Sequence, residues 1–436
     1  MTDPEATRPG ARWAAPEMKA RLARRNRAER RFQRLGLLAI GLAVASLGVL
    51  LASIAWRGVG AFTATEIQLD VDLTWEALGI DAGGSEAQRR AALEKVDFRG
   101  VVRDALRARF PEVTERREKR SLASLLSRGA GRALEERVLA DPGLPGRSVA
   151  VWLPADDEVD LYRKAPEEAT GEGRFTSQEI AWTQALMADG RLRGRLNTRF
   201  LTSGDSREPE LAGIFGAVVG SALTLVVTLL LVFPLGVSAA VYLEEFAPRS
   251  RWTDLIEVNI NNLAAVPSIV FGLLGLAVFL GTFNLPRSAP LVGGLTLALM
   301  TLPTIIITGR VSIQAVPPSI RQAARGLGAS PLQVVVHHVL PLAMPGILTG
   351  TIIGMARALG ETAPLLMIGM VAFVVDIPGG MTDAATALPV QIFLWADSPE
   401  RAFVEKTSGA ILVLLVFLIA MNGAAIAMRR RFEKRW

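Results

Sequence analysis

Residues 317–341 read PPSIRQAARGLGASPLQVVVHHVLP, and residues 346–370 read GILTGTIIGMARALGETAPLLMIGM. The first stretch is polar and has no acidic residue, whereas the second is apolar except for Arg357 and Glu361. A charged side chain near the middle of a bilayer costs about 2.5–3.5 kcal/mol on insertion scales, so these two side chains need a compensating role. The pair indicates a translocation path, and the polar stretch before it indicates a docking element for a soluble partner.

The apolar residues of the chain are grouped into runs that are long enough to cross a membrane. Half of all residues are hydrophobic, and a helix needs about 20 residues to span the hydrocarbon core. The pattern predicts an all-α polytopic membrane protein with six transmembrane helices. The six apolar runs are 35–56, 211–242, 258–285, 291–309, 346–375 and 408–428.

The charge distribution predicts how these runs are oriented. Residues 1–34 hold ten Lys/Arg against four Asp/Glu, and the last eight residues hold five against one. The positive-inside rule therefore places both termini in the cytoplasm, with the first run as a retained anchor. The expected parts are a basic segment 1–34, helix 35–56, an extracytoplasmic insertion 57–210, a permease-like core 211–428 with a cytoplasmic loop 310–345, and a basic tail 429–436.

Several functional classes are disfavoured by the residues that the sequence lacks. There are no cysteines, and the two histidines, His337 and His338, are adjacent, so we expect no metal centre and no cofactor. No G-x-x-x-x-G-K-[ST] motif occurs, so ATP must be hydrolysed by another subunit and this chain is not itself an enzyme. The formal charge of +6 follows from membrane topology and does not indicate nucleic acid.

The insertion has the pattern of a small α+β domain. Residues 66–73 alternate polar and apolar as a half-buried strand does, and Phe98, Val102 and Leu106 repeat at helical spacing. Thr176 and Glu179 fit a capping box before another helix. No catalytic constellation is present in it.

The polar stretch predicts two short helices joined at a glycine elbow. Ser319 and Gln322 fit an N-cap and its N3 partner, and Gly328 suits the left-handed position after the first helix. Ser330 gives a second N-cap, and the second helix is expected to stop before Pro341. The alternative is an ordinary amphipathic connection on the membrane surface.

The apolar stretch predicts a close-packing seam beside the charged pair. Gly346, Gly350 and Gly354 recur every four residues, which lets another helix approach, and Arg357 and Glu361 fall on the same helical face. A guanidinium matches a tetrahedral oxyanion, and a nearby carboxylate accepts a hydrogen bond from the P–OH group of phosphate, which sulfate lacks. Alternatively, the pair only neutralises itself and joins two helices. Further candidates for the path are Thr362, Asn262 and Ser268.

The elbow resembles the EAA loop of bacterial ABC import permeases. The matching residues are Ala323, Ala324, Gly328, Leu340 and Pro341, whereas Gln322 replaces the usual glutamate. The resemblance implies that this segment couples the chain to an ATPase. The glutamine keeps the cap but loses the charge.

Longer segments resemble the PstA-type permeases of bacterial phosphate ABC importers. They are NNLAAVPSIVFGLLGL at 261–276, ARALGETAPLL at 356–366, LPVQIFLWADSP at 388–399 and the ending RRRFEKRW. The resemblance covers residues 211–436 and implies a type I importer permease in the inner membrane. Its implied partners are a PstC-like permease, a PstB-like ATPase dimer and a PstS-like phosphate-binding protein. A PstC-like subunit, a permease for another oxyanion and a secondary transporter remain alternatives, as does an anchored sensor.

Overall fold

The computed structural model describes residues 16–81, 83–166 and 175–432. Residues 1–15 and 433–436 of the two basic ends lie outside these ranges. The chain divides into two units, Met1–Trp56 and Arg57–Trp436. Helix α2 (Pro16–Gly58) makes up the described part of the first unit and contains the run predicted at 35–56. It is long and apolar enough to cross a membrane.

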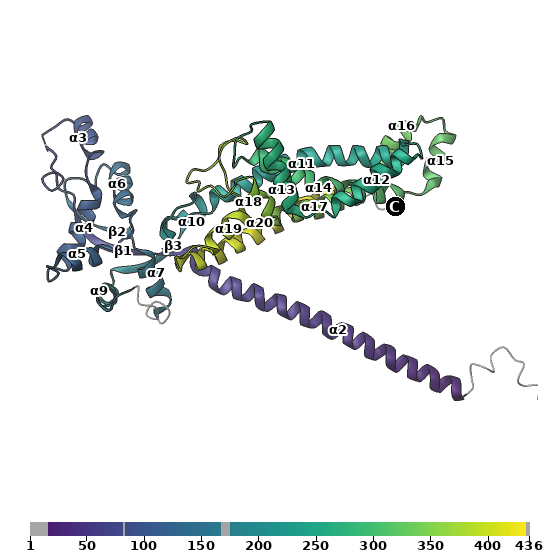
Figure 1. The fold of residues 1–436 in the computed structure, drawn as a ribbon. Coiled ribbons are helices and arrows are strands. Elements are labelled where there is room, and N and C mark those ends of the chain that lie inside the picture. The colour runs from purple at the N-terminus through teal and green to yellow at the C-terminus, as the bar shows by residue number, and fades with distance from the viewer. Residues whose placement is uncertain (1–15, 82, 167–174, 433–436) are drawn as a thin grey trace, which may run out of the picture. The chain divides into compact units, whose positions relative to one another are not determined.

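The insertion is built on a three-stranded antiparallel sheet with the order β2-β1-β3 (Figure 1). The predicted strand is confirmed within β1, where Ile67, Leu69 and Val71 are buried against helices. The predicted helix is confirmed as α4, which buries Phe98 and Leu106. The capping box of Thr176 and Glu179 is also confirmed, because each side chain accepts a hydrogen bond from the other residue's backbone N–H.

The elements of the insertion follow the first span in close succession. They are η2 (Val59–Phe62), β1 (Thr63–Asp72), α3 (Glu86–Leu93), α4 (Phe98–Arg109), α5 (Arg116–Ala123), α6 (Ala130–Ala140), β2 (Ser148–Pro154), α7 (Asp157–Lys164), α9 (Ser177–Ala188), β3 (Leu192–Leu196), α10 (Thr198–Thr202) and η3 (Pro209–Leu211).

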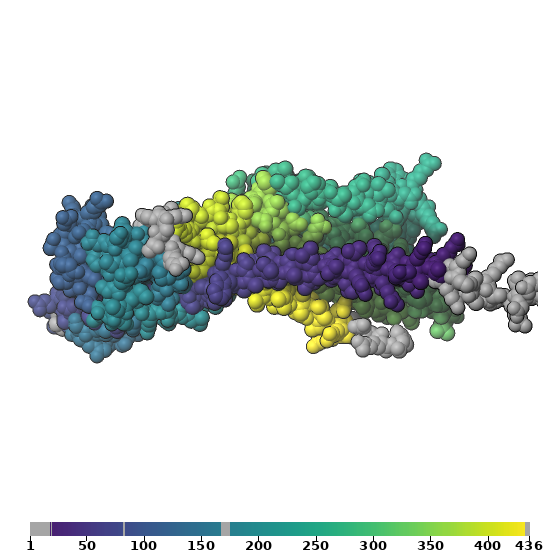
Figure 2. Space-filling model, turned by 90° about the horizontal axis from the view of Figure 1, so that it is seen from below, coloured from purple at the N-terminus to yellow at the C-terminus, as the bar shows by residue number. Residues whose placement is uncertain are grey.

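The rest of the chain is mainly helical and forms the core (Figure 2, green to yellow). Its elements are α11 (Phe215–Val241), η4 (Tyr242–Phe246), α12 (Arg251–Ala264), α13 (Ser268–Gly275), η5 (Leu276–Thr282), α14 (Pro290–Gln314), α15 (Pro318–Gly326), α16 (Pro331–Val334), η6 (Val335–Val339), α17 (Leu340–Gly360), α18 (Ala363–Met367), α19 (Leu388–Ala396) and α20 (Ala402–Phe432). Here η4, η5 and η6 are π-helical turns. Within the described residues, five helices are long and apolar enough to span a membrane, or six if one bent pair counts as a span.

That bent pair corrects the expectation of a continuous helix over 258–285. The run is split into α12 and α13, which meet at an angle of 100°. Pro267 explains the break, because it has no N–H for an intrahelical bond and disfavours helical geometry in Val266 before it.

The run 346–375 is also not one helix. Helix α17 ends at Gly360, the short α18 follows, and the segment from Ile368 to Ala387 is not helical. Pro364 explains the end of α17, because in a continued helix its ring would clash with the carbonyl of Gly360 four residues earlier.

The prediction of a glycine elbow is confirmed at the centre of the segment and is wrong at its two ends. Gly328 has φ of +89°, and Ser330 forms a capping box with Gln333. Ser319 is not the N-cap, because α15 already begins at Pro318, where a first-turn proline needs no hydrogen bond. The second helix does not stop before Pro341, because the wider turn η6 carries the chain through it into α17.

Candidate translocation site and coupling surface

The charged pair lies at the C-terminal end of helix α17. Arg357 is in the last turn of the helix, and Glu361 is its C-cap residue with extended backbone. The Arg357 Nε atom is 3.5 Å from Glu361 Oε1. Glu361 lies beyond the last helical residue, so the prediction that it shares the helical face of the glycines is wrong. The backbone turn at the end of the helix still brings the side chains of Arg357 and Glu361 together.

The ion pair with Glu361 leaves most of the Arg357 guanidinium available to bind another group. The Arg357 side chain is 56% exposed and that of Glu361 is 21% exposed. Among the described residues, no hydrogen bond from the terminal Nη1 or Nη2 atoms of Arg357 is found. The planar edge of the guanidinium can therefore bind a second oxyanion beside Glu361.

The other predicted path residues lie on neighbouring short helices. Ser268 is half-buried at the start of α13, and Thr362 is half-buried just before α18. These two helices pack together, with Gly272 facing Pro364. Asn262 is exposed on α12, on the other side of the bend. The structure thus gathers Ser268 and Thr362 onto packed elements and leaves Asn262 apart.

The glycine seam of α17 packs against α14 of the same chain. A Cβ atom on Gly346 would overlap the Ser312 hydroxyl, and one on Gly350 would overlap the side chain of Thr308. The contact is looser at Gly354, where a Cβ would lie 3.7 Å from Ile305 Cγ1. The helix that the seam admits is therefore α14.

The predicted coupling residues divide into an exposed and an anchored set. Gln322, Ala323 and Gly328 are exposed, whereas Ala324 is buried in an apolar cluster with Val334. Leu340 and Pro341 lie in the helical run that joins the elbow to α17, where Leu340 packs against the same cluster.

Two exposed leucines at the elbow were not predicted as functional residues. Leu327 is 91% exposed and Leu332 is 63% exposed, although both lie beside an otherwise buried apolar cluster. Their sequence signal was available, since they are the apolar residues that flank the Gly328 turn. They give the elbow an apolar tip suited to a protein partner.

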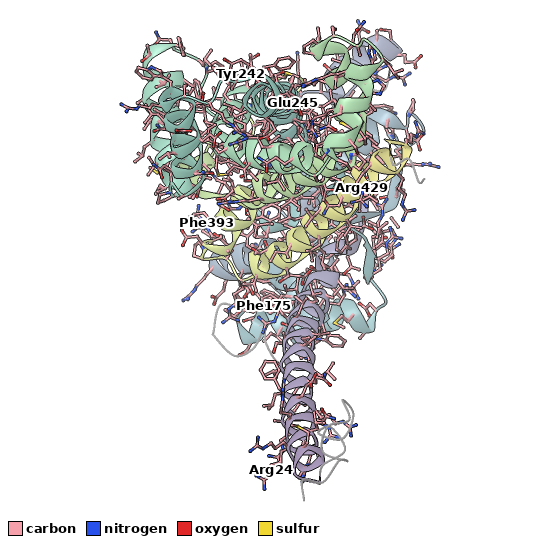
Figure 3. The ribbon with its side chains drawn as sticks, turned by 90° about the vertical axis from the view of Figure 1, so that its right-hand side faces the viewer. Arg24, Phe175, Tyr242, Glu245, Phe393 and Arg429 are labelled. Carbon is pink, nitrogen blue, oxygen red and sulfur yellow. The ribbon has the colours of Figure 1, made fainter. Side chains whose placement is uncertain are left out.

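A buried ion pair that sequence reasoning missed fixes the elbow to the membrane helices. Arg321 on α15 donates to Glu245 Oε1 through Nε (2.9 Å) and Nη2 (2.7 Å). It also donates to the backbone carbonyls of Val316 (2.6 Å) and Ile313 (2.9 Å). Glu245, labelled in Figure 3, belongs to the π turn η4 at the end of α11.

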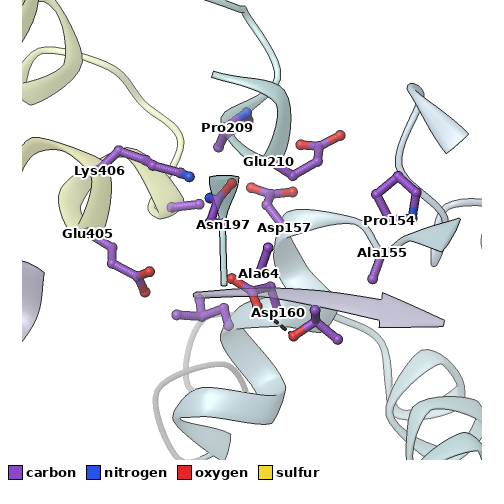
Figure 4. Close-up of a pocket in the computed structure, with 13 residues that line it drawn as sticks. Ala64, Pro154, Ala155, Asp157, Asp160, Asn197, Pro209, Glu210, Glu405 and Lys406 are labelled. Atoms are coloured by element: carbon purple, nitrogen blue, oxygen red, sulfur yellow. Dashed lines mark hydrogen bonds between the residues drawn. The ribbon is translucent and has the colours of Figure 1, made fainter. Parts of the chain in front are cut away.

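A second charged cluster joins the insertion to α20, and Figure 4 shows three of its members, Asp160, Glu405 and Lys406. The Lys164 ammonium donates to Asp160 Oδ2 (2.6 Å), to Glu405 Oε1 (2.7 Å) and to the carbonyl of Gly60 (2.9 Å). Lys406 is 6% exposed, and its ammonium lies 4.9 Å from the ring centre of Phe200. The insertion is thus tied to the first turn of the last helix.

Beside this cluster lies a cavity of about 40 Å³ that contains an incompletely bonded carboxylate. Glu210 accepts a hydrogen bond from Ser127 Oγ (2.6 Å), but its buried Oε2 atom has no hydrogen-bond partner within the described part of the chain. Burial raises the pKa of Glu210 to about 7, and the negative charges of Asp157 and Glu208 act in the same direction.

The membrane helices and the elbow define a subunit that moves a solute while a separate protein supplies the energy. Residues 232–436 match the family model described as "Binding-protein-dependent transport system inner membrane component". Residues 19–171 match a domain of unknown function, DUF3333. The chain belongs to the family of binding-protein-dependent transport system inner membrane components.

Similar proteins include two curated relatives. The phosphate transport system permease protein PstA 1 of Mycobacterium tuberculosis (strain CDC 1551 / Oshkosh) is 33% identical over 229 residues, which cover 51% of this chain and 74% of the relative. PstA of Pasteurella multocida is 30% identical over 49% of this chain and 75% of the relative. The inward-facing methionine ABC transporter MetNI is similar at 18% identity with a TM-score of 0.40, over 51% of this chain and 96% of its own.

Membership of this family determines the class of protein to which the chain belongs. It is a multi-pass inner membrane protein and the non-catalytic permease component of an ABC importer, without a cofactor of its own. Permeases of this kind assemble with ATPase and binding-protein subunits. The expectations of an ABC importer permease fold and of a non-enzymatic role are confirmed.

Proposed function

We propose that this chain is the PstA-type permease of an ATP-driven phosphate importer. In this role it forms half of the translocation path, beside a PstC-like permease. A PstB-like ATPase dimer docks on the elbow from the cytoplasm, and a PstS-like protein delivers phosphate from outside. Both termini are cytoplasmic and the insertion is extracytoplasmic.

The observation that carries the proposal is the incompletely used guanidinium of Arg357. Its ion pair with Glu361 uses Nε at 3.5 Å and leaves the terminal nitrogens available. Arginine is always charged and presents its donors in a fixed fork that fits a tetrahedral oxyanion. Glu361 supplies the acceptor for a P–OH hydrogen, which favours phosphate over sulfate. The names of the relatives, which are phosphate permeases, support the same solute.

The exposed apolar tip of the elbow supports coupling to a separate ATPase. Leu327 and Leu332 are presented on a segment whose conformation is fixed by Gly328 and by the capping box at Ser330. A rigid, exposed tip can pass on the movement of a bound partner, whereas a flexible loop would absorb it.

The test is uptake by the reconstituted complex. The chain is expressed with its partner genes, purified by a tag on this chain and placed in proteoliposomes with internal ATP. We expect an ATPase to copurify and labelled phosphate to enter, with unlabelled arsenate competing better than sulfate. Uptake of sulfate in place of phosphate would favour a permease for another oxyanion. Uptake without any ATPase would contradict the proposal and favour a secondary transporter.

A further inference from the structure

We propose that Arg321 is a positioning residue that transmits the movement of the elbow to helix α11 through Glu245. The inference rests on the proposed function, because it concerns how ATP hydrolysis by a partner reaches the translocation path. It adds a specific connection between elbow and core that lies outside the residues of the EAA pattern.

The first argument is that a single guanidinium joins three elements. Arg321 belongs to α15, its carboxylate partner Glu245 belongs to the turn that ends α11, and its two carbonyl partners lie at and just beyond the end of α14. The bonds to Glu245 measure 2.9 and 2.7 Å. Any displacement of α15 therefore acts on α11 and α14 together.

The second argument is burial. The side chain of Glu245 is 8% exposed and that of Arg321 is 18% exposed. Water can hardly replace a broken bond at this depth, so each partner depends on the other for its hydrogen bonds. The Arg321–Glu245 ion pair therefore keeps one arrangement, and the two residues move together.

The third argument is that the same turn of α11 is held from a second side. Glu244, next to Glu245 in η4, lies 3.5 Å from Arg310 Nε and accepts a hydrogen bond from Gln314 (2.9 Å). Arg310 in turn donates to Glu257 on α12 (2.8 Å). Here the turn presents one carboxylate to α14 and the next to the elbow.

The fourth argument separates this contact from the general attachment of the elbow. Ala324, Val334 and Val339 hold the elbow to the core by apolar packing. The elbow can therefore fold and remain in place without the ion pair. The Arg321–Glu245 pair adds directional hydrogen bonds. Its loss removes the transmission of movement.

A matched control lies outside the elbow. Arg251 begins α12, is exposed, and makes no side-chain hydrogen bond or ion pair among the described residues. Arg251→Gln removes the same charge without touching the Arg321–Glu245 pair or the docking surface.

The experiment compares Arg321→Gln, Glu245→Gln and the control Arg251→Gln in the complete complex in proteoliposomes. Copurified ATPase, ATP hydrolysis and phosphate uptake are measured together. We expect all three complexes to assemble, and we expect phosphate taken up per ATP hydrolysed to fall at least tenfold in Arg321→Gln and Glu245→Gln only. Equal uptake per ATP in all three variants would overturn the proposal. Failure of the unmodified complex to take up phosphate would instead overturn the proposed function.

A crosslink keeps the proposal testable if a charge variant assembles poorly. The chain has no cysteine, so Arg321→Cys with Glu245→Cys creates its only thiols, in a complex with cysteine-free partners. We expect low uptake per ATP before treatment and at least a fivefold recovery after a short bifunctional thiol reagent links the two positions. Full coupling before treatment, or none after linkage, would contradict the inference.

Discussion

Two arginine–glutamate pairs in the core are arranged in opposite ways. Arg321 is 18% exposed and makes four hydrogen bonds, two to Glu245 and two to backbone carbonyls. Arg357 is 56% exposed and contacts Glu361 at 3.5 Å through Nε. The first guanidinium uses four of its five N–H donors within the fold, whereas the second retains its terminal donors for another group.

The difference indicates which pair is structural and which is available to a solute. A buried arginine with most of its donors bonded fixes the positions of the helices around it and offers no pair of free donors to a ligand. A partly used arginine contributes little to the fold and can exchange partners. An argument based only on charged residues in apolar surroundings would not distinguish the two pairs.

The largest expected effect concerns the helix that presents Arg357. Gly350→Leu places a side chain where Thr308 already lies, so α17 can no longer pack on α14. We expect the purified yield of folded protein to fall at least tenfold, as measured by size-exclusion chromatography with fluorescence detection. Gly360→Ala is the control, because nothing lies within 4 Å of a Cβ there. A normal yield for Gly350→Leu would show that the seam does not hold the site.

The second effect compares the two arginines directly. Arg321→Met leaves Glu245 as a buried unpaired charge, so we expect the free energy of unfolding to fall by about 3 kcal/mol. Arg357→Met breaks an exposed pair, and the expected change is under about 1 kcal/mol. Unfolding of both variants in denaturant tests the contrast. Equal losses of stability would remove the distinction between a structural and an available arginine.

The third effect concerns selectivity. Glu361→Gln replaces the charged carboxylate acceptor with a neutral amide, whose oxygen accepts more weakly and whose NH₂ group donates to sulfate and phosphate alike. We expect the preference for phosphate over sulfate in competition uptake to fall about tenfold, since one charged hydrogen bond is worth about 1.5 kcal/mol or more. Glu361→Asp keeps the acceptor and should retain part of the preference. An unchanged preference in Glu361→Gln would remove Glu361 from the recognition of phosphate.

The smallest effect lies at the junction of insertion and core and depends on pH. The pKa of Glu210 is raised from 4.5 to about 7, mainly by burial. The folded state therefore favours the protonated acid, and stability falls as the pH rises from about 4.5 to about 7. Glu210→Gln mimics the protonated form and should melt about 2–4 °C higher than the unmodified protein at pH 8.

The difference between Glu210→Gln and the unmodified protein should shrink as the pH is lowered towards 5. Differential scanning fluorimetry across this range checks the trend, with Glu112→Gln as the control because Glu112 is exposed and makes no side-chain hydrogen bond or ion pair among the described residues. Other titratable groups face the same junction, and they are common to both proteins: Asp156, Asp157, Asp160, Lys164, Glu405 and Lys406. A difference that does not vary with pH would show that Glu210 does not titrate there.

The features that sequence could predict depend on residues close together in the chain. The strand within β1, the capping box at Thr176 and the left-handed Gly328 each follow from a few neighbouring residues. The apolar runs follow from local composition in the same way. The helix ends near Pro267 and Pro364 were within reach too, because proline removes a backbone donor.

The features that sequence could not predict depend on contacts between distant residues. Arg321 and Glu245 are 76 positions apart, and Lys164 and Glu405 are 241 apart. In the sequence, the charges of these residues indicated only on which side of the membrane a segment lies. The π turn before Pro341 was also missed, because that turn depends on how α17 is held against the rest of the core.

The most direct test of the central claim is phosphate uptake with Arg357 replaced in an otherwise intact complex. Arg357→Gln and Arg357→Lys are compared with Arg251→Gln, with copurified ATPase measured for each. The account predicts full assembly in all three, uptake at least 100-fold lower in Arg357→Gln, partial uptake in Arg357→Lys and normal uptake in Arg251→Gln. Normal phosphate uptake by a fully assembled Arg357→Gln complex would contradict it.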